Sequence, residues 1–372
     1  MAERKAVSSL PFVSVVVPAL NCAEDVAGFV AAMKRQDYPA DRFEVIVVDN
    51  GSTDDTYDRL QAAGLIALQR LEKGRARALN TGIETARGSI ILTTDLSCRA
   101  EPQWISAVVA AFAAHPRAGC VAGDIKLLRT TSSWVIDFQE RSDYMSPFLA
   151  LSRTHLPFMP FADGANASFR RQLFDEIGGF EETFVKAADV EICYRMFVLT
   201  DYMLVFSRAA LVWEPGEPSL RALLRQRFRI GVGSNLMRMK YPSLYESARW
   251  RFDVRQVWWG VRAGIVNSVR LASLNLGLLL GRNRDKAIDV DIRQLMSWAQ
   301  SLGRHYGRWW LRQRKITPIP VDAGRIRAFL ANTRPLEGRI ELVDFAVTRA
   351  ATLQDSGAAE LAVEKTRRTS LR

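Results

Sequence analysis

The stretch VSVVVPALNCAEDVAGFVAAMKRQDYPADRFEVIVVDN, residues 13–50, decides the fold. It opens and closes with apolar, β-branched runs, Val13–Val17 and Phe43–Val48, which are typical of strands buried on both faces of a parallel sheet. Between them, residues 23–36 carry apolar side chains at helical spacing. Strand, helix and strand in this order predict a βαβ unit and therefore an α/β fold.

The following segments repeat this alternation. Helices are expected at 54–63, 74–86 and 104–114. Ser52 or Thr53 would be the N-cap of the first of them. A strand is expected at Ser89–Thr94, and Asp95 follows it directly, just as Asp49 ends the strand before it. Because ligands of open α/β sheets bind at the carboxyl ends of strands, both aspartates are candidate site residues.

The elements expected after Gly119 are less regular. They are a strand at Cys120–Leu128, an aromatic-rich helix at Ser132–Leu151, a loop, short helix and turn within Asp163–Phe180, a helix at Asp189–Leu199 and a strand at Tyr202–Phe206. The sequence shows no internal repeat and no low-complexity linker.

Composition excludes several classes of protein. Of the 372 residues, 48% are hydrophobic and 24% charged, which argues against a disordered chain, a collagen or a multi-span membrane protein. The net charge of +11 is unevenly placed, since residues 1–250 hold 29 basic and 29 acidic side chains whereas residues 251–372 hold 22 and 11. The basic surplus therefore belongs to the last third of the chain.

Cysteine usage and the N-terminus favour a cytoplasmic protein. Cys22, Cys98, Cys120 and Cys193 form no Cys-x-x-Cys pair and have no histidine close by in the sequence, so reduced thiols are expected rather than a zinc site. The apolar run near the N-terminus is interrupted by Pro11 and Pro18 and lacks a cleavage site, so no secretory signal is expected.

The basic third has two distinctive parts. Val257–Gly281 is long enough to span a bilayer, but Arg262 and Arg270 argue against it, because a central Arg costs about 2.5–3.5 kcal/mol. A helical pattern follows with one apolar stripe made of Ile292, Leu295, Trp298, Leu302, Tyr306 and Trp309. A neighbouring face carries Arg304, Arg308 and Arg312. Residues 351–372 are expected to be a polar tail.

Two interpretations of this region stay open. Trp258, Trp259, Trp309 and Trp310 lie close to arginines in the sequence, and interfacial helices combine these residue types, which favours an anionic membrane surface as partner. The alternative is a helical subdomain that packs Trp298 and Leu302 onto the rest of the protein. Nucleic acid is not expected as a partner, because no recognisable binding module is present.

Acidic residues at three places in the sequence carry candidate chemistry. Asp49 could accept hydrogen bonds from a base or ribose, although a turn with a helix cap explains the same residues. Asp95 could hold a divalent cation on a diphosphate, but Ser97 stands where a second carboxylate would strengthen the site. Asp189 and Glu191 open a helix, where an acidic side chain can be a general base or can simply favour the helix dipole.

Six segments in order resemble the family 2 glycosyltransferases of GT-A fold. They are VSVVVPALN, VIVVDNGSTDDT, RARALNTGIETARG, ILTTDLS, GANASFRRQLFDEIGGF and ADVEICYR, and they lie within Val13–Gly233. The resemblance implies a mostly parallel, mixed sheet flanked by helices, plus a C-terminal helical region. The expected division is a catalytic domain at 1–233, a basic helical extension at 234–350 and a flexible tail at 351–372.

The resemblance also assigns roles to residues. The nucleotide-binding residues would be Pro18, Ala19, Asn21, Asp49, Lys73, Arg77 and Asp95, with Asn80 beside them. The acceptor-side loop would contain Gly164, Ala165 and Asn166. The diphosphate would contact Arg225, Arg227 and Arg229. Asp189 would be the catalytic base, and Asp95 would hold a Mn²⁺ or Mg²⁺ ion.

The implied activity is inverting transfer of a sugar from a nucleotide-sugar donor, by default a UDP-sugar. The acceptor would be a hydroxyl of a glycan or lipid-linked acceptor in cell-surface polysaccharide or glycolipid synthesis, at the inner face of the cytoplasmic membrane. Ser97, Ala188 and Glu214 depart from the family pattern, so a catalytically impaired scaffold in a glycan-assembly complex is the alternative. A sugar-nucleotide pyrophosphorylase is disfavoured, because its Gly-rich N-terminal signature is absent.

Overall fold

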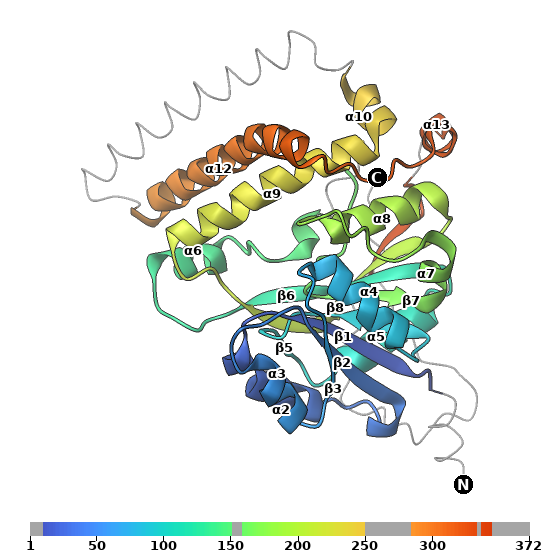
Figure 1. Ribbon diagram of the computed structural model, residues 1–372, viewed down its shortest axis with the longest axis vertical. Helices are drawn as coiled ribbons and strands as arrows, with labels where there is room; N and C mark the ends of the chain where they lie inside the picture. Colours follow the sequence, from blue (N-terminus) through green and yellow to red (C-terminus); the bar gives the residue numbers. More distant parts are fainter. Residues whose placement is uncertain (1–9, 151–157, 250–283, 333–335, 344–372) are drawn as a thin grey trace.

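The computed structural model of the chain describes residues 10–150, 158–249, 284–332 and 336–343 (Figure 1). The apolar segment Val257–Gly281, with its tryptophans, and the tail at 351–372 lie outside these residues. Of the described helices, none combines the length and the apolar character needed to cross a bilayer.

The predicted βαβ unit is present. Strands β1 (Val13–Ala19) and β2 (Phe43–Asp49) pair in parallel, with Val13 opposite Phe43. The remaining strands are β3 (Ile66–Gln69), β4 (Ile90–Thr93), β5 (Arg99–Ala100), β6 (Ala118–Leu128), β7 (Ala167–Arg170), β8 (Met203–Pro215) and β9 (Ile340–Val343). They form one sheet in the order β3-β2-β1-β4-β7-β6-β8-β5, with β9 paired to β8. Strand β7 runs antiparallel to β4 and β6, and β5 runs antiparallel to β8, so the sheet is mixed.

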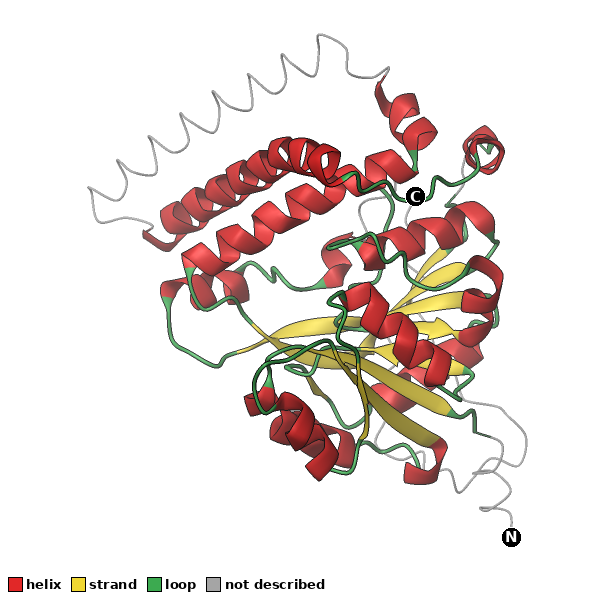
Figure 2. Cartoon of the chain, in the orientation of Figure 1, coloured by secondary structure: helices red, strands yellow, loops and turns green. Residues whose placement is uncertain are grey.

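Helices cover both faces of this sheet, as Figure 2 shows. The helices are α2 (Val26–Lys34), α3 (Thr56–Ala62), α4 (Arg75–Thr85), α5 (Trp104–Ala114), α6 (Trp134–Arg141), α7 (Arg171–Ile177), α8 (Ala188–Leu199), α9 (Leu220–Lys240), α10 (Pro242–Arg249), α12 (Arg284–Arg314) and α13 (Ala323–Ala331). Short 3-10 turns lie at η1 (Ala23–Asp25), η2 (Ala40–Arg42) and η3 (Pro147–Ala150).

The alternation of side chains along β1 divides the core into two layers. Val16 packs in the layer that contains α4 and α8, whereas Val15 and Val17 pack in the layer that contains α2 and α5. All three valines are fully buried. Because neighbouring strand residues point to opposite faces, a strand covered on both sides needs apolar residues at consecutive positions, which is the pattern of the sequence.

Two expectations about local structure are wrong. The helix expected at Ser132–Leu151 is confined to α6, which ends at Arg141, because Asp143 has a positive φ of 47° and Pro147 opens the turn η3. Ser52 and Thr53 do not cap α3, whose N-cap is Asp55. They bond to Asn21 instead.

Helices α9 and α12 lie side by side at one side of the molecule (Figure 1). Glycines allow their close approach, since a Cβ at Gly303 would lie 2.0 Å from the Phe228 carbonyl oxygen and one at Gly231 would lie 2.1 Å from the Gln300 carbonyl oxygen. Helix α9 also runs through residue 233, where the sequence suggested a domain boundary.

The contact face of α12 differs from the expected one. Ile292 and Met296 are buried, but Trp298 is 58% exposed and Leu302 is 65% exposed. The interpretation that Trp298 and Leu302 pack onto the rest of the protein is therefore wrong. The reason is that Gly303 and Gly307, which add no hydrophobic signal to the sequence, make close contacts with α9.

Candidate active site

The carboxyl ends of the central strands gather the candidate site residues at one edge of the sheet. Asp49 ends β2, and Asp95 follows β4 two strands away in the sheet order. Strand β7 is antiparallel to β4 and begins at Ala167, so the preceding loop, residues 163–166, lies at the same edge. This is where open α/β sheets bind their ligands.

The loops after β1 and β2 are bonded to each other. The Asn21 side-chain oxygen accepts a hydrogen bond from the Thr53 amide at 2.8 Å, and the Asn21 amide donates to the Ser52 hydroxyl at 2.9 Å. The buried Asp49 carboxylate accepts from the Ser52 amide at 3.3 Å. In this structure Asp49 closes a turn, and base binding by Asp49 stays a prediction.

A chain of polar contacts joins Asp95 to Asp189 across this edge. The Arg75 guanidinium donates through Nη2 to Asp95 Oδ1 at 2.6 Å and to the Gly164 carbonyl at 3.1 Å. The Gly164 amide in turn donates to Asp189 Oδ2 at 3.0 Å. A Cβ at position 164 would lie 2.6 Å from Arg75 Nη1, so a side chain there would displace the Arg75 guanidinium. One residue, Gly164, thus links Asp189 to the Arg75–Asp95 pair through its amide and its carbonyl.

Two further carboxylates complete an acidic cluster, which we define as Asp95, Asp163, Asp189 and Glu214. The pKa of Asp163 is raised from 3.8 to about 6, first by burial and then by the Asp189 charge. The pKa of Glu214 is raised well above its usual value by burial and by the Asp163 and Asp95 charges. The Arg75 charge opposes the rise at both carboxyls, and the Lys186 charge opposes the rise at Glu214.

Arg227 lies on the α9 side of the cluster. Its guanidinium sits over the Tyr144 ring, 4.3 Å from the centroid, and the Tyr144 hydroxyl donates to the Gln226 side chain at 2.6 Å. Tyr144 is within electrostatic range of Asp163 and Glu214, so Arg227 lies on the side of α9 that faces the cluster. Arg225 and Arg229 lie on the exposed side of the same helix.

Other predicted residues are engaged elsewhere. Arg77 pairs with Glu72 and Glu182, each at 2.8 Å, and Asn80 bonds to the backbone of Phe180. Lys73 is exposed, Pro18 is half-buried and Ala19 is buried beside Asp49 in the β1–β2 register.

The loop residues Ala165 and Asn166 are both buried. The Asn166 side chain donates to the Asp124 and Ala210 carbonyls and accepts from the Trp104 indole N–H at 2.8 Å. These bonds tie the loop to β6 and β8, while acceptor binding by this loop stays a prediction.

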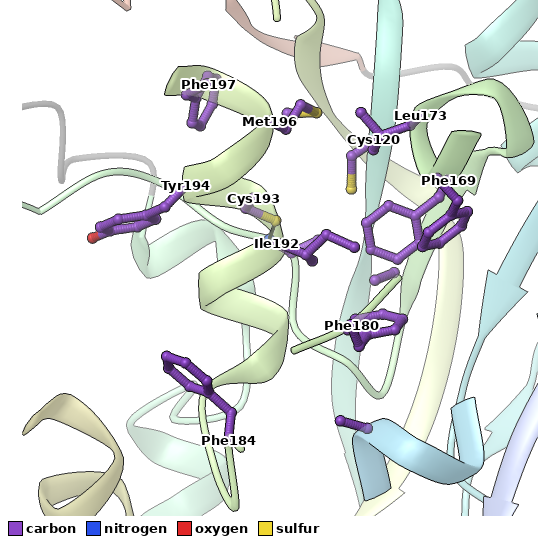
Figure 3. Close-up of a cluster of buried hydrophobic side chains, with 14 of the residues drawn as sticks. Cys120, Phe169, Leu173, Phe180, Phe184, Ile192, Cys193, Tyr194, Met196 and Phe197 are labelled. Atoms are coloured by element: carbon purple, nitrogen blue, oxygen red, sulfur yellow. Dashed lines mark hydrogen bonds between the residues drawn. The ribbon is translucent and has the colours of Figure 1, made fainter. Parts of the chain in front are cut away.

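Helix α8, which carries Asp189, is held by a packed face and a buried ion pair. Figure 3 shows the apolar side, where Ile192, Cys193 and Met196 pack near Phe169 and Phe180. On another side the buried Lys240 ammonium lies 3.1 Å from Glu191 Oε1.

Sequence reasoning missed Arg75 and Asp163 as site residues. Helical spacing separates Arg75 from Arg77 by about 200°, so only one of them can face the cluster. The sequence does not say which, and no pattern distinguishes Asp163 from an ordinary polar loop residue.

Comparison with known proteins gives the family. The sequence model described as Glycosyl transferase family 2 matches residues 14–178. The chain therefore carries a family 2 glycosyltransferase domain. It is 29% identical over 238 residues to glycosyltransferase AglE of Haloferax volcanii, which covers 61% of this chain and 74% of that one. It is 25% identical over 267 residues to a beta-monoglucosyldiacylglycerol synthase of Nostoc sp., which covers 69% of this chain and 55% of the relative, so the match spans about half of that enzyme.

A solved structure supports the expected α/β architecture of GT-A type for this glycosyltransferase. The mannosyltransferase PcManGT from Pyrobaculum calidifontis, in complex with GDP-Man and Mn²⁺, superposes with a TM-score of 0.57 at 21% identity. The match covers 81% of this chain and 88% of PcManGT, so the two share a fold.

The residues at this edge fit a divalent cation held jointly with a donor. Among the described residues, no three Asp, Glu, His or Cys side chains form a metal-binding group. Mg²⁺ is usually bound by one or two carboxylates together with substrate phosphates and water. Such a site needs fewer protein ligands than a group of three side chains. The Asp95 carboxylate and the Ser97 hydroxyl are oxygen donors of this kind.

Proposed function

We propose that this glycosyltransferase inverts configuration and that Asp189 is its general base. The observation that supports this role is the hydrogen bond of 3.0 Å from the Gly164 amide to Asp189 Oδ2. It holds the carboxylate beside the acceptor-side loop, while Arg75 links the carbonyl of the same glycine to Asp95 on the donor side. The base and the donor-side carboxylate are therefore positioned by a common support.

The proposed reaction is a single displacement. Asp189 accepts the proton of an acceptor hydroxyl as that oxygen forms a bond to the anomeric carbon, and the bond to the diphosphate oxygen breaks with its electron pair. Arg227 and Arg75 are the nearby cations of this chain that can stabilise the departing charge. A divalent cation at Asp95, when bound, would add Lewis-acid stabilisation of the same charge.

We further propose a nucleotide-sugar as the donor and a hydroxyl of a glycan or glycolipid as the acceptor. PcManGT is described with GDP-Man, and the Nostoc relative is named for a glycolipid product, so both classes of substrate are consistent with this chain. A panel of UDP- and GDP-sugars, scored for binding and hydrolysis with and without Mn²⁺, would identify the donor.

Asp189→Asn tests the base. The amide oxygen can still accept from Gly164, so the loop and donor binding should persist, whereas transfer should fall by about 10²–10⁴-fold. Asp201→Asn is the matched control, since Asp201 is exposed just beyond the other end of α8. Turnover near the wild-type rate in Asp189→Asn, with an unchanged donor affinity, would remove Asp189 from this role.

We also propose that α12 attaches the enzyme to an anionic membrane surface. Trp298, Leu302, Tyr306 and Trp309 form an exposed stripe on one face of α12, with Tyr306 and Trp309 at 43% and 56% exposure. Residues 292–321 contain no Asp or Glu, and neither does α9. Apolar aromatic residues bordered by cations are what an anionic bilayer surface binds.

The arginines of this surface are close enough to repel one another. The pKa of Arg304 is lowered by burial and then by the Arg238 and Arg308 charges. An anionic lipid headgroup would relieve this repulsion. The surface that we propose is therefore the stripe on α12 together with these three arginines.

Vesicle sedimentation of the full-length enzyme tests the attachment. Phosphatidylcholine vesicles that contain phosphatidylglycerol should bind it at low salt, and pure phosphatidylcholine vesicles should bind it weakly. Trp298→Ser combined with Trp309→Ser should lower the affinity by about tenfold or more. Ile66→Ser, an exposed apolar residue on the edge strand β3, is the control. Equal binding of the double variant and the wild type would refute the proposal.

A further inference from the structure

The loop that follows α6 is held in place by contacts with β6. Asp143 has a positive φ of 47°, and its carboxylate lies 3.2 Å from the Lys126 ammonium. The Ser146 hydroxyl donates to Asp124 Oδ1 at 3.2 Å, and both of these side chains are buried. Tyr144 lies between these two anchors in the sequence. The backbone on both sides of Tyr144 is therefore fixed.

The Tyr144 side chain reaches from this loop to α9. Its hydroxyl donates to Gln226 Oε1 at 2.6 Å, and Arg227 Cζ lies 4.3 Å from the centroid of its ring. The ring also packs against the small apolar cluster that joins α6, α9 and α12, which includes Phe138 and Leu223. One side chain thus contacts two consecutive residues of α9.

Burial keeps the Tyr144 hydroxyl protonated near neutral pH. It raises the pKa of this group to about 12, although the Arg227 charge acts in the opposite direction. The phenol therefore remains a hydrogen-bond donor to Gln226 and presents a neutral ring to the cation. A guanidinium within about 6 Å of a ring centroid is attracted to the ring face, and the attraction is stronger where water is excluded.

Arg227 and its two neighbouring arginines face different directions. A helix turns by about 100° per residue, so Arg225 and Arg229 lie about 200° from Arg227 around the helix axis. Both of these arginines are exposed, whereas Arg227 is half-buried on the side that faces the acidic cluster. An arginine side chain has many rotamers, and fixing it in one of them costs more conformational entropy than for most residues.

We propose that Tyr144 is a positioning residue for Arg227, which the face of its ring holds toward the diphosphate of the donor. The inference rests on the proposed function, in which Arg227 stabilises the departing diphosphate. Because the guanidinium is already in place in the free enzyme, less conformational entropy is lost when the diphosphate binds. A cation that is positioned in advance also stabilises developing charge more effectively in the transition state.

Two other roles for Tyr144 fit the contacts less well. A platform on which a sugar stacks needs an open ring face, and the Arg227 guanidinium covers one face of this ring. A purely structural role accounts for the packing against Phe138 and Leu223. It does not account for the position of the guanidinium over the ring, on the side of α9 that faces the acidic cluster.

The affinity of the full-length enzyme for UDP and GDP, measured by isothermal titration calorimetry, tests the proposal, since both nucleotides carry a diphosphate. Tyr144→Leu keeps an apolar side chain without a ring and should weaken the binding by about tenfold. Tyr144→Phe keeps the ring and should retain most of the affinity. Arg227→Met should also weaken the binding, and Tyr144→Leu added to Arg227→Met should cause no further loss, because the two side chains act as a pair.

Phe12→Leu is the matched control. Arg87 Cζ lies over the Phe12 ring at 5.1 Å, and Phe12 precedes the first residue of β1, at the opposite edge of the sheet from the acidic cluster. This variant removes the same kind of contact and should bind UDP and GDP like the wild type.

A graded series of substitutions separates the charge distribution of the ring from its shape. Phenylalanines with one, two or three fluorine atoms on the ring, placed at position 144, keep the shape while the negative potential of the ring face weakens step by step. The affinity for the nucleoside diphosphates should fall in the same order. A structural role would leave the affinity constant along the series.

The outcomes separate this proposal from the proposed function. Constant affinity along the fluorinated series would overturn the role of Tyr144, and so would additive losses for Tyr144→Leu and Arg227→Met. Normal nucleotide binding by Arg227→Met would also overturn it, because Tyr144 would then have no diphosphate ligand to position. Asp189 as general base is scored on transfer rates in Asp189→Asn, so its failure would appear there and not in these affinities.

Discussion

Arg75 Nη2 lies 2.6 Å from Asp95 Oδ1, and each side chain is one-third exposed. The pair is therefore neither a buried structural bridge nor a freely solvated one. It lies where a donor diphosphate is proposed to bind, and the same guanidinium holds the Gly164 carbonyl. The proposed donor site and the proposed acceptor loop are thus connected through a single cation.

Replacement of Arg75 should affect catalysis more than stability. Arg75→Met removes two hydrogen bonds and the cation that faces the acidic cluster, so kcat/KM should fall by about tenfold or more. Arg75→Lys keeps the charge and should retain an intermediate rate. Arg77→Met is the control, since Arg77 pairs with Glu72 and Glu182 outside the cluster. A lower kcat/KM for Arg77→Met than for Arg75→Met, measured by steady-state kinetics, would contradict this assignment.

The raised pKa of Asp163 predicts a pH-dependent stability. Its carboxyl has a pKa of about 6 in the folded protein against 3.8 ordinarily, so the folded state binds the proton more tightly. The free energy of unfolding should therefore fall as pH rises from about 4 to about 6, and stay lowered above that. At pH values below the ordinary pKa both states are protonated and this contribution to pH dependence vanishes.

Asp163→Asn removes this titration. The variant should gain about 1 kcal/mol over the wild type at neutral pH, a value discounted for partial exposure, and should gain nothing near pH 4. Urea unfolding at both pH values measures the difference, with the exposed Asp58→Asn as a control. A gain of equal size at both pH values would show that Asp163 does not titrate in this way.

The buried Lys240 should be costly to remove. Its ammonium lies 2.8 Å from Glu181 and 3.1 Å from Glu191, and Glu191 is fully buried. Lys240→Met removes the positive charge that is paired with these two carboxylates. It should therefore lower the free energy of unfolding by about 3–5 kcal/mol. Adding Glu181→Gln should recover part of the loss, and Lys315→Met, at an exposed position, should change little. Denaturant titration of the three variants measures these differences.

Much of the sheet could be predicted from the sequence, because strands buried on both faces need consecutive apolar residues. Val13–Val17 and Phe43–Val48 meet this condition, and the polar residues after such strands mark the ligand edge. Asp49 and Asp95 were accessible in this way, whereas Asp189 was identified at the start of a helix. Strand β7 (Ala167–Arg170) was not, since its four residues have no distinctive pattern and pair through their backbone.

The contacts across the site could not be predicted. The choice of Arg75 over Arg77 depends on the rotation of α4 relative to the loop 163–166, which no local pattern records. The position of Glu214 near Asp95 depends on the β5–β8 register, which joins segments more than a hundred residues apart. For α12, the apolar periodicity predicted the wrong contact face and marked a stripe that is exposed. Glycines make the close contact with α9, and a glycine contributes no apolar side chain to a periodicity.

The glycine contact between α9 and α12 gives the final prediction. A Cβ at Gly303 would lie 2.0 Å from a backbone oxygen of Phe228, which cannot move as a side chain would, so Gly303→Ala must push the two helices apart. Alanine is favoured over glycine in a helix by about 1 kcal/mol, which offsets only part of an overpacking cost of about 1–3 kcal/mol. Ser297→Ala, on the exposed face of the same helix, should be neutral or slightly stabilising. Thermal unfolding should therefore show a lower Tm for Gly303→Ala alone. An increase in Tm for both variants would mean that the two helices separate without cost and that the close contact contributes nothing to stability.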